Sequence, residues 1–278
     1  MEPGREQRQG LTVTAPVPPA AAFAPRTSPG IVSGASAADA RALFEAGRLD
    51  AAVERLGAEL RADPADARRR TFLFELLAFA GQYDRAAKQL DVLAGAGGSA
   101  EAGAMVYRAA LDAERVREHM FATGDFPRAP APEPVAGTLN GRPFRSIADA
   151  DPRVGARLEV IAGGRYLWIP FAHLAAVRVE APARLRDLRW ATARVATGPS
   201  VRDLELGEVL LPALTPAAWR LDDPELRLGR AADWEEAADG AFRPVGQKLL
   251  AVDDAFVPLV EVRELTLDGF PADSTPAA

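Results

Sequence analysis

The chain has 278 residues, of which 48% are hydrophobic and 26% charged, so it is long enough to bury one large core or two smaller ones. Its net charge of −6 disfavours a general nucleic-acid-binding protein, because affinity for phosphates requires a positive surface. It contains no cysteine, which excludes disulfides and thiol nucleophiles. It contains only two histidines, His119 and His173. Since no hydrolase or nucleotide-binding motif is present, we expect no catalytic residue set, no cofactor and no bound metal.

Residues 1–36 combine proline with alanine, serine and glycine, and we expect a disordered tail, because such a composition buries too little apolar surface to offset lost chain entropy. A flexible C-terminus is expected at 271–278. The apolar run from Phe72 to Ala80 is too short to cross a bilayer and contains Glu75. The absence of a secretion signal and of cysteine favours a cytoplasmic protein.

An internal repeat follows the tail. The segments 43–56 and 77–90 match at positions 34 residues apart, namely Gly47 with Gly81, Asp50 with Asp84, Ala52 with Ala86 and Leu56 with Leu90. This period is typical of the tetratricopeptide repeat, a helix–turn–helix unit. In this interpretation the glycine ends the first helix, the aspartate caps the second, and the alanine lets the two helices approach closely. An unrelated pair of helical hairpins is the alternative.

Two such units need a further helix to cover their last apolar face. Residues 99–122 are the candidate, with apolar residues at helical spacing at Val106, Ala109, Ala110, Ala113 and Val116. The sequence therefore predicts a tetratricopeptide-like helical domain over 37–123.

Helical spacing also predicts a binding groove. Four side chains, those of Arg68, Phe72, Glu75 and Phe79, share one face of the helix expected within 68–80. In repeats of this kind that face lines a concave groove that accepts a peptide or a helix. The alternative is that Phe72 and Phe79 pack as ordinary core residues.

A proline-rich linker at 124–137 separates the helices from a β-rich domain expected at 138–270. Strands are predicted within 157–171, 175–180, 190–197, 207–214 and 247–267. The first segment contains a Gly163-Gly164 hairpin turn, although its first run fits a helix as well, and the last segment turns near Asp253-Asp254. The expected fold class is α+β, with helical hairpins followed by a mainly antiparallel sheet.

Asp149, Asp151 and Glu159 form a carboxylate cluster that allows one alternative function, a metal-dependent hydrolase. However, "DADP" at 149–152 is also a favourable turn, in which aspartates bond to their own backbone and proline fixes φ. We therefore prefer the turn. The four tryptophans, Trp168, Trp190, Trp219 and Trp234, are interpreted as core anchors.

Several segments resemble a known family. They are "RRRTFLFELLAFAGQYDRAAKQLDVL" (68–93), "GTLNGRPFRSIADADPRVGARLEVIAGGRYLWIPF" (137–171), "RLRDLRWATA" (184–193), "ADWEE" (232–236) and "GQKLLAVDDAFVPLVEVREL" (246–265). In this order they are similar to the ImpE/TagJ accessory proteins of bacterial type VI secretion, also called SciE-type virulence proteins.

The resemblance implies a cytoplasmic, non-enzymatic accessory protein of a contractile injection apparatus. It implies binding to a helix at the N-terminus of the small subunit of the contractile sheath, and an indirect link to the unfoldase that recycles the sheath. It implies neither nucleic acid nor membrane as a partner. A generic repeat scaffold that serves another assembly is the remaining alternative.

Overall fold

The computed structural model describes residues 39–127, 133–198, 201 and 206–268. The predicted tail at 1–36, the C-terminus at 271–278 and residues 128–132 of the predicted linker lie outside these ranges. Residues 37–278 form one compact unit, so the helices and the sheet are described together.

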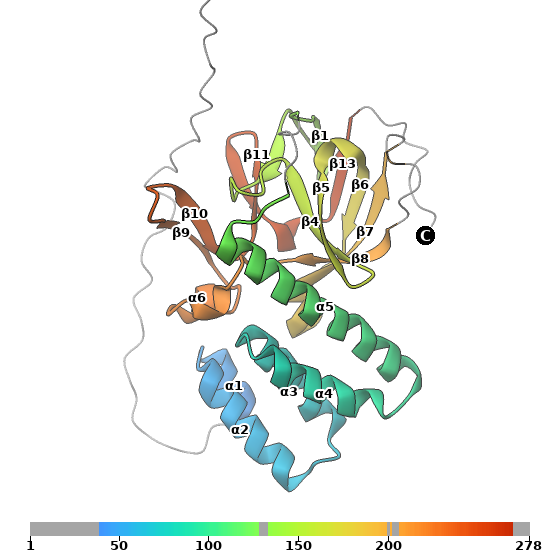
Figure 1. The fold of residues 1–278 in the computed structure, drawn as a ribbon, viewed down its shortest axis with the longest axis vertical. Coiled ribbons are helices and arrows are strands. Elements are labelled where there is room, and N and C mark those ends of the chain that lie inside the picture. Colours follow the sequence, from blue (N-terminus) through green and yellow to red (C-terminus); the bar gives the residue numbers. More distant parts are fainter. Residues whose placement is uncertain (1–38, 128–132, 199–200, 202–205, 269–278) are drawn as a thin grey trace, which may run out of the picture. The chain divides into compact units, whose positions relative to one another are not determined.

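Two helical hairpins and a long fifth helix make up the first part of this unit (Figure 1). Their bounds are α1 Ala40–Glu45, α2 Leu49–Ala62, α3 Ala67–Phe79, α4 Tyr83–Ala94 and α5 Gly98–Thr123. Each helix packs on the next along the chain from α1 to α5. Ala52 and Ala86 are fully buried between helices, as their small size predicts. Gly47 and Gly81 follow α1 and α3 with φ of 75° and 68°, a conformation that favours glycine and ends each first helix as predicted.

The aspartates of the repeat do not cap the second helices, which corrects the prediction. Asp50 and Asp84 lie one position inside α2 and α4, and neither helix has a side-chain cap. Asp50 instead pairs with Arg227 at 3.0 Å, and Asp84 pairs with Arg115 at 2.7 Å. Both carboxylates remain favourable there, because the N-terminal end of a helix carries partial positive charge.

The repeat glycines also meet side chains from the second half of the chain. A Cβ atom at Gly81 would lie 2.6 Å from the ring of Trp219, and one at Gly47 would lie 2.8 Å from Pro224. The two glycines therefore end helices and also leave room for the segment around α6 (Pro224–Arg227).

We expect Gly81→Ala to lower the free energy of unfolding by about 1–3 kcal/mol more than Gly124→Ala does, because alanine would displace Trp219. Gly124 is the matched control, since its φ of 73° is similar and no atom lies within 4 Å of its added Cβ. Both variants share the cost of the left-handed backbone. Urea unfolding followed by circular dichroism measures the difference, and equal losses would contradict the contact.

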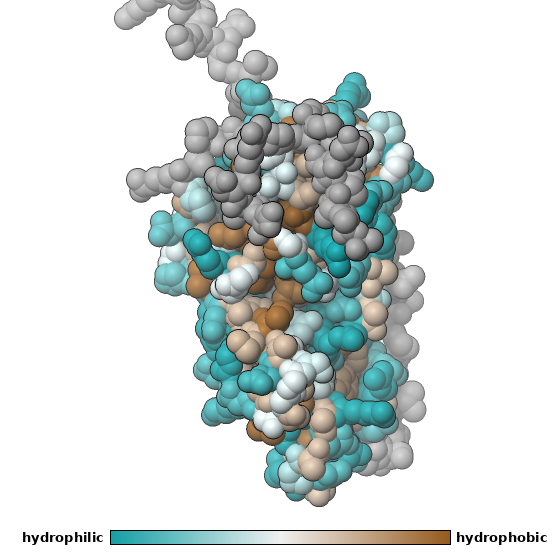
Figure 2. Space-filling view, turned by 90° about the vertical axis from the view of Figure 1, so that its right-hand side faces the viewer, coloured by the Kyte–Doolittle hydropathy of each residue, from teal (hydrophilic) through white to brown (hydrophobic). Residues whose placement is uncertain are grey.

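The buried face of α5 differs from the predicted one. Ala110 and Ala113 are buried as expected, but Val106 and Val116 are 52% and 58% exposed. Glu114 and Arg117 are buried in their place, because they pair with groups of the sheet. Figure 2 shows one face of the molecule, on which a band of hydrophobic residues lies among hydrophilic ones. Exposed apolar residues are thus part of this surface.

An antiparallel eight-stranded sheet forms the second part, in the order β2-β1-β13-β6-β7-β8-β4-β5. Its strands are β1 Gly137–Leu139, β2 Arg142–Phe144, β4 Arg157–Ala162, β5 Arg165–Pro170, β6 Leu174–Val179, β7 Trp190–Thr197, β8 Gly207–Pro212 and β13 Glu264–Leu267. A three-stranded antiparallel sheet contains β3 Ile147–Asp149, β11 Leu249–Val252 and β12 Ala255–Pro258. A two-stranded antiparallel sheet contains β9 Ala232–Glu236 and β10 Phe242–Gly246. The predicted α+β class is confirmed.

Every predicted strand segment contains a strand, and both hairpin turns lie where expected. Gly163 and Gly164 join β4 to β5 with φ of 53° and 75°, so the first run of this segment is a strand and not a helix. Asp253, with φ of 48°, joins β11 to β12. Five short strands, β1, β2, β3, β9 and β10, are not among the predicted ones, although Asn140-Gly141 between β1 and β2 is a strong hairpin signal.

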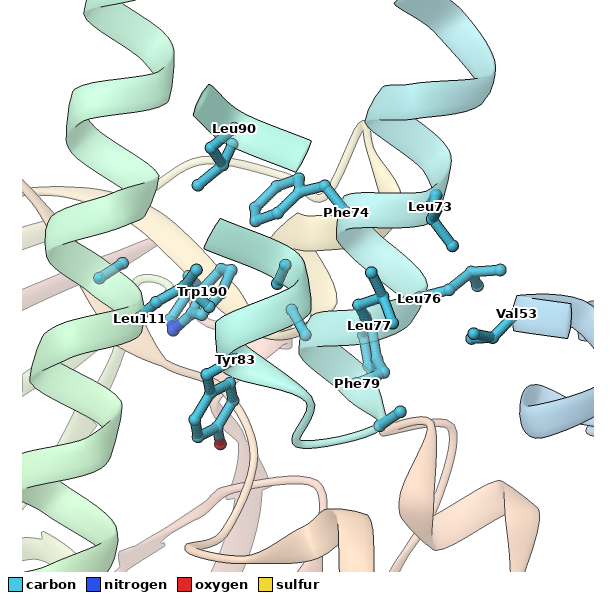
Figure 3. Packing of buried hydrophobic residues seen from close by; sticks show 14 of the residues in the cluster. Val53, Leu73, Phe74, Leu76, Leu77, Phe79, Tyr83, Leu90, Leu111 and Trp190 are labelled. Carbon is cyan, nitrogen blue, oxygen red and sulfur yellow. The ribbon is translucent and has the colours of Figure 1, made fainter. Parts of the chain in front are cut away.

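Helices and sheet share a hydrophobic core, and α5 lies between the sheet and the other helices (Figure 1). Trp190 of β7 is fully buried, and Figure 3 shows it beside Leu111 of α5. The regions treated as separate domains from sequence, 37–123 and 138–270, therefore contact each other through this core. A second core lies within the sheet.

Candidate functional site

A groove of about 800 Å³ lies between the first helices and a segment that precedes β7. We call it the α1–α3 groove. Its lining includes Arg41 and Phe44 of α1, Arg68, Phe72 and Glu75 of α3, and residues 183–186. The last segment leads into the 3-10 helix η2 Leu185–Leu188, so one wall of the groove comes from the sheet half of the chain. The volume is in the range of binding pockets for organic ligands and peptide side chains.

The structure brings three of the four predicted groove residues together. Arg68, Phe72 and Glu75 all line the α1–α3 groove. Phe79 does not, because it is fully buried in the helical core near the C-terminal end of α3 (Figure 3). Phe79 is thus an ordinary core residue, which is the alternative that the sequence allows for Phe72 and Phe79.

An aromatic pair forms the apolar part of the groove. The rings of Phe44 and Phe72 meet edge to face, with 6.0 Å between their centroids. The guanidinium of Arg41 lies over the Phe72 ring at 5.5 Å. Both phenylalanines are only half buried, so they present apolar surface to a ligand. Edge-to-face rings with an exposed side are suited to hold an apolar side chain.

An ion pair ties the far wall of the groove to α3. Arg186 donates a hydrogen bond to Glu75 at 2.8 Å, and its guanidinium lies 4.9 Å from the ring centroid of Tyr107 in α5. Glu75 is only 7% exposed, and burial raises its pKa although Arg186 opposes the shift. The Glu75 carboxylate therefore anchors the segment 183–186 to α3 through its ion pair with Arg186.

This wall of the groove is not predicted by the sequence. Nothing in the local pattern around Arg184 and Arg186 indicates a groove, because the contact to Glu75 spans 111 residues. Phe44 was also missed, since α1 has only six residues and shows little periodicity.

The carboxylate cluster considered for metal chemistry is already paired with cations. Lys248 Nζ lies 2.5 Å from Asp149 Oδ2 and also bonds to Glu159. Arg117 holds Glu159 through two hydrogen bonds of 2.7 Å and 3.2 Å. Asp151 instead accepts hydrogen bonds from the Arg153 side chain. Within the described ranges, no group of three or more acidic or histidine side chains is arranged to hold a metal ion.

The electrostatics of this network suit a structural role. Burial alone would raise the pKa of Glu159, but Arg117 and Lys248 outweigh it and hold the pKa below its ordinary value. Burial raises the pKa of Asp149, and Lys248 opposes that shift. Since Arg117 also donates to the carbonyl of Leu214 at 2.9 Å, the network joins α5 to four segments of the sheet half, those that contain Asp149, Glu159, Leu214 and Lys248.

A second buried network joins α4, α5 and the start of β7. Arg189 donates to the Tyr83 hydroxyl at 2.7 Å, and Tyr83 in turn bonds to Glu118. Trp190 donates to Glu114 at 3.0 Å, and Trp219 donates to Glu118 at the same distance. These bonds satisfy the Tyr83 hydroxyl and both indole N–H groups, whereas Nε of Arg189 is buried without a hydrogen-bond partner among the described residues.

Known proteins match this chain over most of its length. The ImpE protein family model matches residues 141–266. The type VI secretion system accessory component TagJ of Pseudomonas aeruginosa (strain PAO1) is 34% identical over 274 residues, which cover 85% of this chain and 94% of TagJ.

The fold is also similar to the crystal structure of protein VPA1032 from Vibrio parahaemolyticus. The TM-score is 0.71 at 20% identity, and the match covers 82% of this chain and 97% of the other. Among the described residues, none of the helices combines the length and the hydropathy needed to cross a bilayer. The extent and identity of the TagJ match, together with the ImpE model, decide the family, and the chain belongs to the ImpE/TagJ family of type VI secretion system accessory proteins.

Proposed function

We propose that this type VI secretion accessory protein is a non-enzymatic adaptor whose α1–α3 groove binds a helix of the small subunit of the contractile sheath. The observation that carries the proposal is the half-exposed Phe44–Phe72 pair inside a groove of about 800 Å³. A helix that enters such a groove places apolar side chains at helical spacing against the rings. The relation to the sheath-recycling unfoldase is then indirect, through the sheath subunit.

The non-enzymatic part of the proposal is supported by the buried networks. The three carboxylates considered for catalysis are paired with cations, Asp149 with Lys248, Glu159 with Arg117 and Asp151 with Arg153. They are therefore not available to a substrate. We further propose that the protein acts in the cytoplasm without binding nucleic acid or membrane. The net charge of −6 favours this view, because nucleic acids and most membrane surfaces are anionic.

Calorimetric titration tests the proposal. The intact chain is titrated with a peptide that copies the N-terminal helix of the sheath small subunit from the same organism. We expect a Kd of about 10 μM or tighter. Phe72→Ala should weaken binding about tenfold, because it removes half of the aromatic pair. Phe242→Ala is the matched control, since this phenylalanine is 50% exposed on β10 and does not line the groove.

Phe79 is unsuitable for this experiment, since truncating a fully buried phenylalanine would disturb the core. Circular dichroism must show that each variant is folded before its affinity is compared. Absence of binding by the folded wild-type protein would contradict the sheath-helix assignment, and equal affinities of Phe72→Ala and Phe242→Ala would contradict the groove.

A further inference from the structure

We infer that the α1–α3 groove selects an acidic amphipathic helix, with carboxylates that face the groove arginines and apolar side chains that contact Phe44 and Phe72. This inference rests on the proposed function, since it specifies the chemistry of the helix that the groove accepts. The unequal charge of the lining carries the argument. Four arginines, Arg41, Arg68, Arg184 and Arg186, line the groove with a single carboxylate, that of Glu75.

The carboxylates close to these arginines already have partners. Glu75 accepts a hydrogen bond from Arg186 at 2.8 Å. Asp187 accepts hydrogen bonds from the backbone N–H groups of Ala183 and Arg184, at 2.9 Å and 2.8 Å. Glu45 lies 3.9 Å from Arg41 on the exposed surface of α1. These contacts leave the positive charge of the groove only partly neutralised.

Two of the four guanidinium groups are available to a ligand. In the described part of the chain, Arg68 and Arg184 form no ion pair, and both residues are exposed. They come from different elements, α3 and the segment before η2. A ligand that contacts both must therefore lie within the groove and not on one helix alone. Arginine binds carboxylates through paired hydrogen bonds, so acidic side chains are its natural partners.

The combination of features defines the ligand further. Arg41 lies over the Phe72 ring, so cationic and aromatic surfaces are adjacent in the same groove. A helix with one acidic edge and one apolar edge matches both surfaces at once, whereas a uniformly acidic chain would leave the rings uncovered.

The chain's own N-terminal residues are a poorer occupant on charge. Residues 1–38 contain three arginines (Arg5, Arg8, Arg26) and only two glutamates (Glu2, Glu6). Their net charge has the same sign as the groove, which disfavours binding. Nucleic acid is disfavoured because the whole chain carries a charge of −6. The acidic helix is the occupant that the observations favour.

Fluorescence anisotropy with labelled peptides tests the inference on the intact protein. Three designed helical peptides share one apolar stripe and carry glutamate, glutamine or lysine at the same polar positions. We expect the glutamate peptide to bind at least about tenfold tighter than the lysine peptide at low salt, with glutamine between them. We also expect its affinity to fall as salt rises from about 50 mM to about 300 mM, because ions screen exposed charges.

Charge reversal in the protein supplies the second half of the test. Arg68→Glu and Arg184→Glu should each reduce the affinity for the glutamate peptide and improve it for the lysine peptide. Arg61→Glu is the matched control, because Arg61 is exposed at the end of α2 and does not line the groove. It should change neither affinity by more than about twofold.

The outcomes separate this inference from the proposed function. If the sheath-subunit helix binds but neither the salt series nor the arginine reversals change its affinity, the acidic preference is wrong and the adaptor function stands. If the glutamate peptide binds with the predicted charge dependence and the sheath helix does not bind, the sheath is the wrong partner and the groove chemistry stands. Tighter binding of a labelled single-stranded oligonucleotide than of the glutamate peptide would overturn the inference.

Discussion

Replacing Lys248 with methionine is expected to lower the free energy of unfolding by about 3–5 kcal/mol at neutral pH. The ammonium group lies between Asp149 and Glu159, and all three side chains are almost fully buried. Methionine fills a similar volume but leaves the two carboxylates with Arg117 as their remaining cation. One negative charge is then buried without a partner, which is costly in a medium of low polarity. Urea unfolding of both proteins, followed by circular dichroism, measures the loss.

Lys88→Met provides a control with the same chemical change at an exposed position of α4, and its stability should stay within about 0.5 kcal/mol of wild type. Adding Asp149→Asn to Lys248→Met should recover part of the lost stability, because it removes the unpaired charge. A loss of less than about 1 kcal/mol in Lys248→Met would contradict the structural role of the network.

The effect of Lys248→Met should depend on pH. In the folded protein burial raises the pKa of Asp149 to about 6, and Lys248 opposes that shift. A carboxyl whose pKa is raised by folding contributes stability that is present below its unfolded pKa, about 4, and is lost as pH rises through its folded pKa. Loss of the ammonium raises the folded pKa further, so the variant loses more stability than wild type as pH rises.

Glu159 acts in the same direction. Its pKa is held below the ordinary value by Arg117 and Lys248, so its stabilising contribution is present above pH of about 4 and is lost on acidification. Losing Lys248 reduces that contribution at every pH above the folded pKa of Glu159, so this part of the difference is already present near pH 4. The difference between wild type and Lys248→Met should therefore be present near pH 4 through Glu159 and grow as pH rises above about 6 through Asp149. Unfolding curves at several pH values measure it, and a constant difference would contradict this assignment.

Trp190→Ala is expected to cost about 3–5 kcal/mol as well. The Trp190 ring is fully buried where β7 meets the helices, with its centroid 6.4 Å from that of Phe74 and 5.9 Å from that of Tyr107. Its indole N–H donates to the buried carboxylate of Glu114 at 3.0 Å. Alanine would leave a cavity between the helices and the sheet and would remove a hydrogen-bond donor from a buried charge.

Two further variants separate these effects. Trp190→Phe keeps most of the packing and loses only the donor, so it should cost less than Trp190→Ala. Trp234→Ala removes a tryptophan of the β9–β10 hairpin that is only half buried against Phe256, and it should also cost less. Urea unfolding followed by circular dichroism compares all three. A Trp190→Ala loss no larger than that of Trp234→Ala would contradict a central role for Trp190 between helices and sheet.

Local chemistry explains which elements could be predicted. Gly47, Gly81, Gly163 and Gly164 all adopt positive φ, and they end helices or form the β4–β5 turn where the sequence predicts them. Such a turn depends on a few consecutive residues, so its signal is present in the sequence itself. The strand segments were found for the same reason.

Side-chain faces were harder to predict because partners come from distant parts of the chain. The apolar stripe of α5 was expected to bury Val106 and Val116, yet Glu114 and Arg117 are buried there. A charged residue is normally placed outside, and only its pairing with sheet residues makes burial favourable. Phe79 shows the same limit, since helical spacing aligns it with Phe72 but cannot show that the core covers this end of α3.

The sequence by itself determined the order of the helical hairpins and of the predicted strands, the turns at their glycines, the likeness to the ImpE/TagJ family and three of the side chains that line the groove. The tertiary structure alone decided that residues 183–186 form a wall of that groove and that Glu75 forms an ion pair with Arg186. It also decided that Lys248 and Arg117 pair with Asp149 and Glu159, two of the carboxylates considered for metal binding. The physical reason is range. Backbone propensities act over a few residues, whereas these ion pairs join groups that approach only after the helices pack on the sheet.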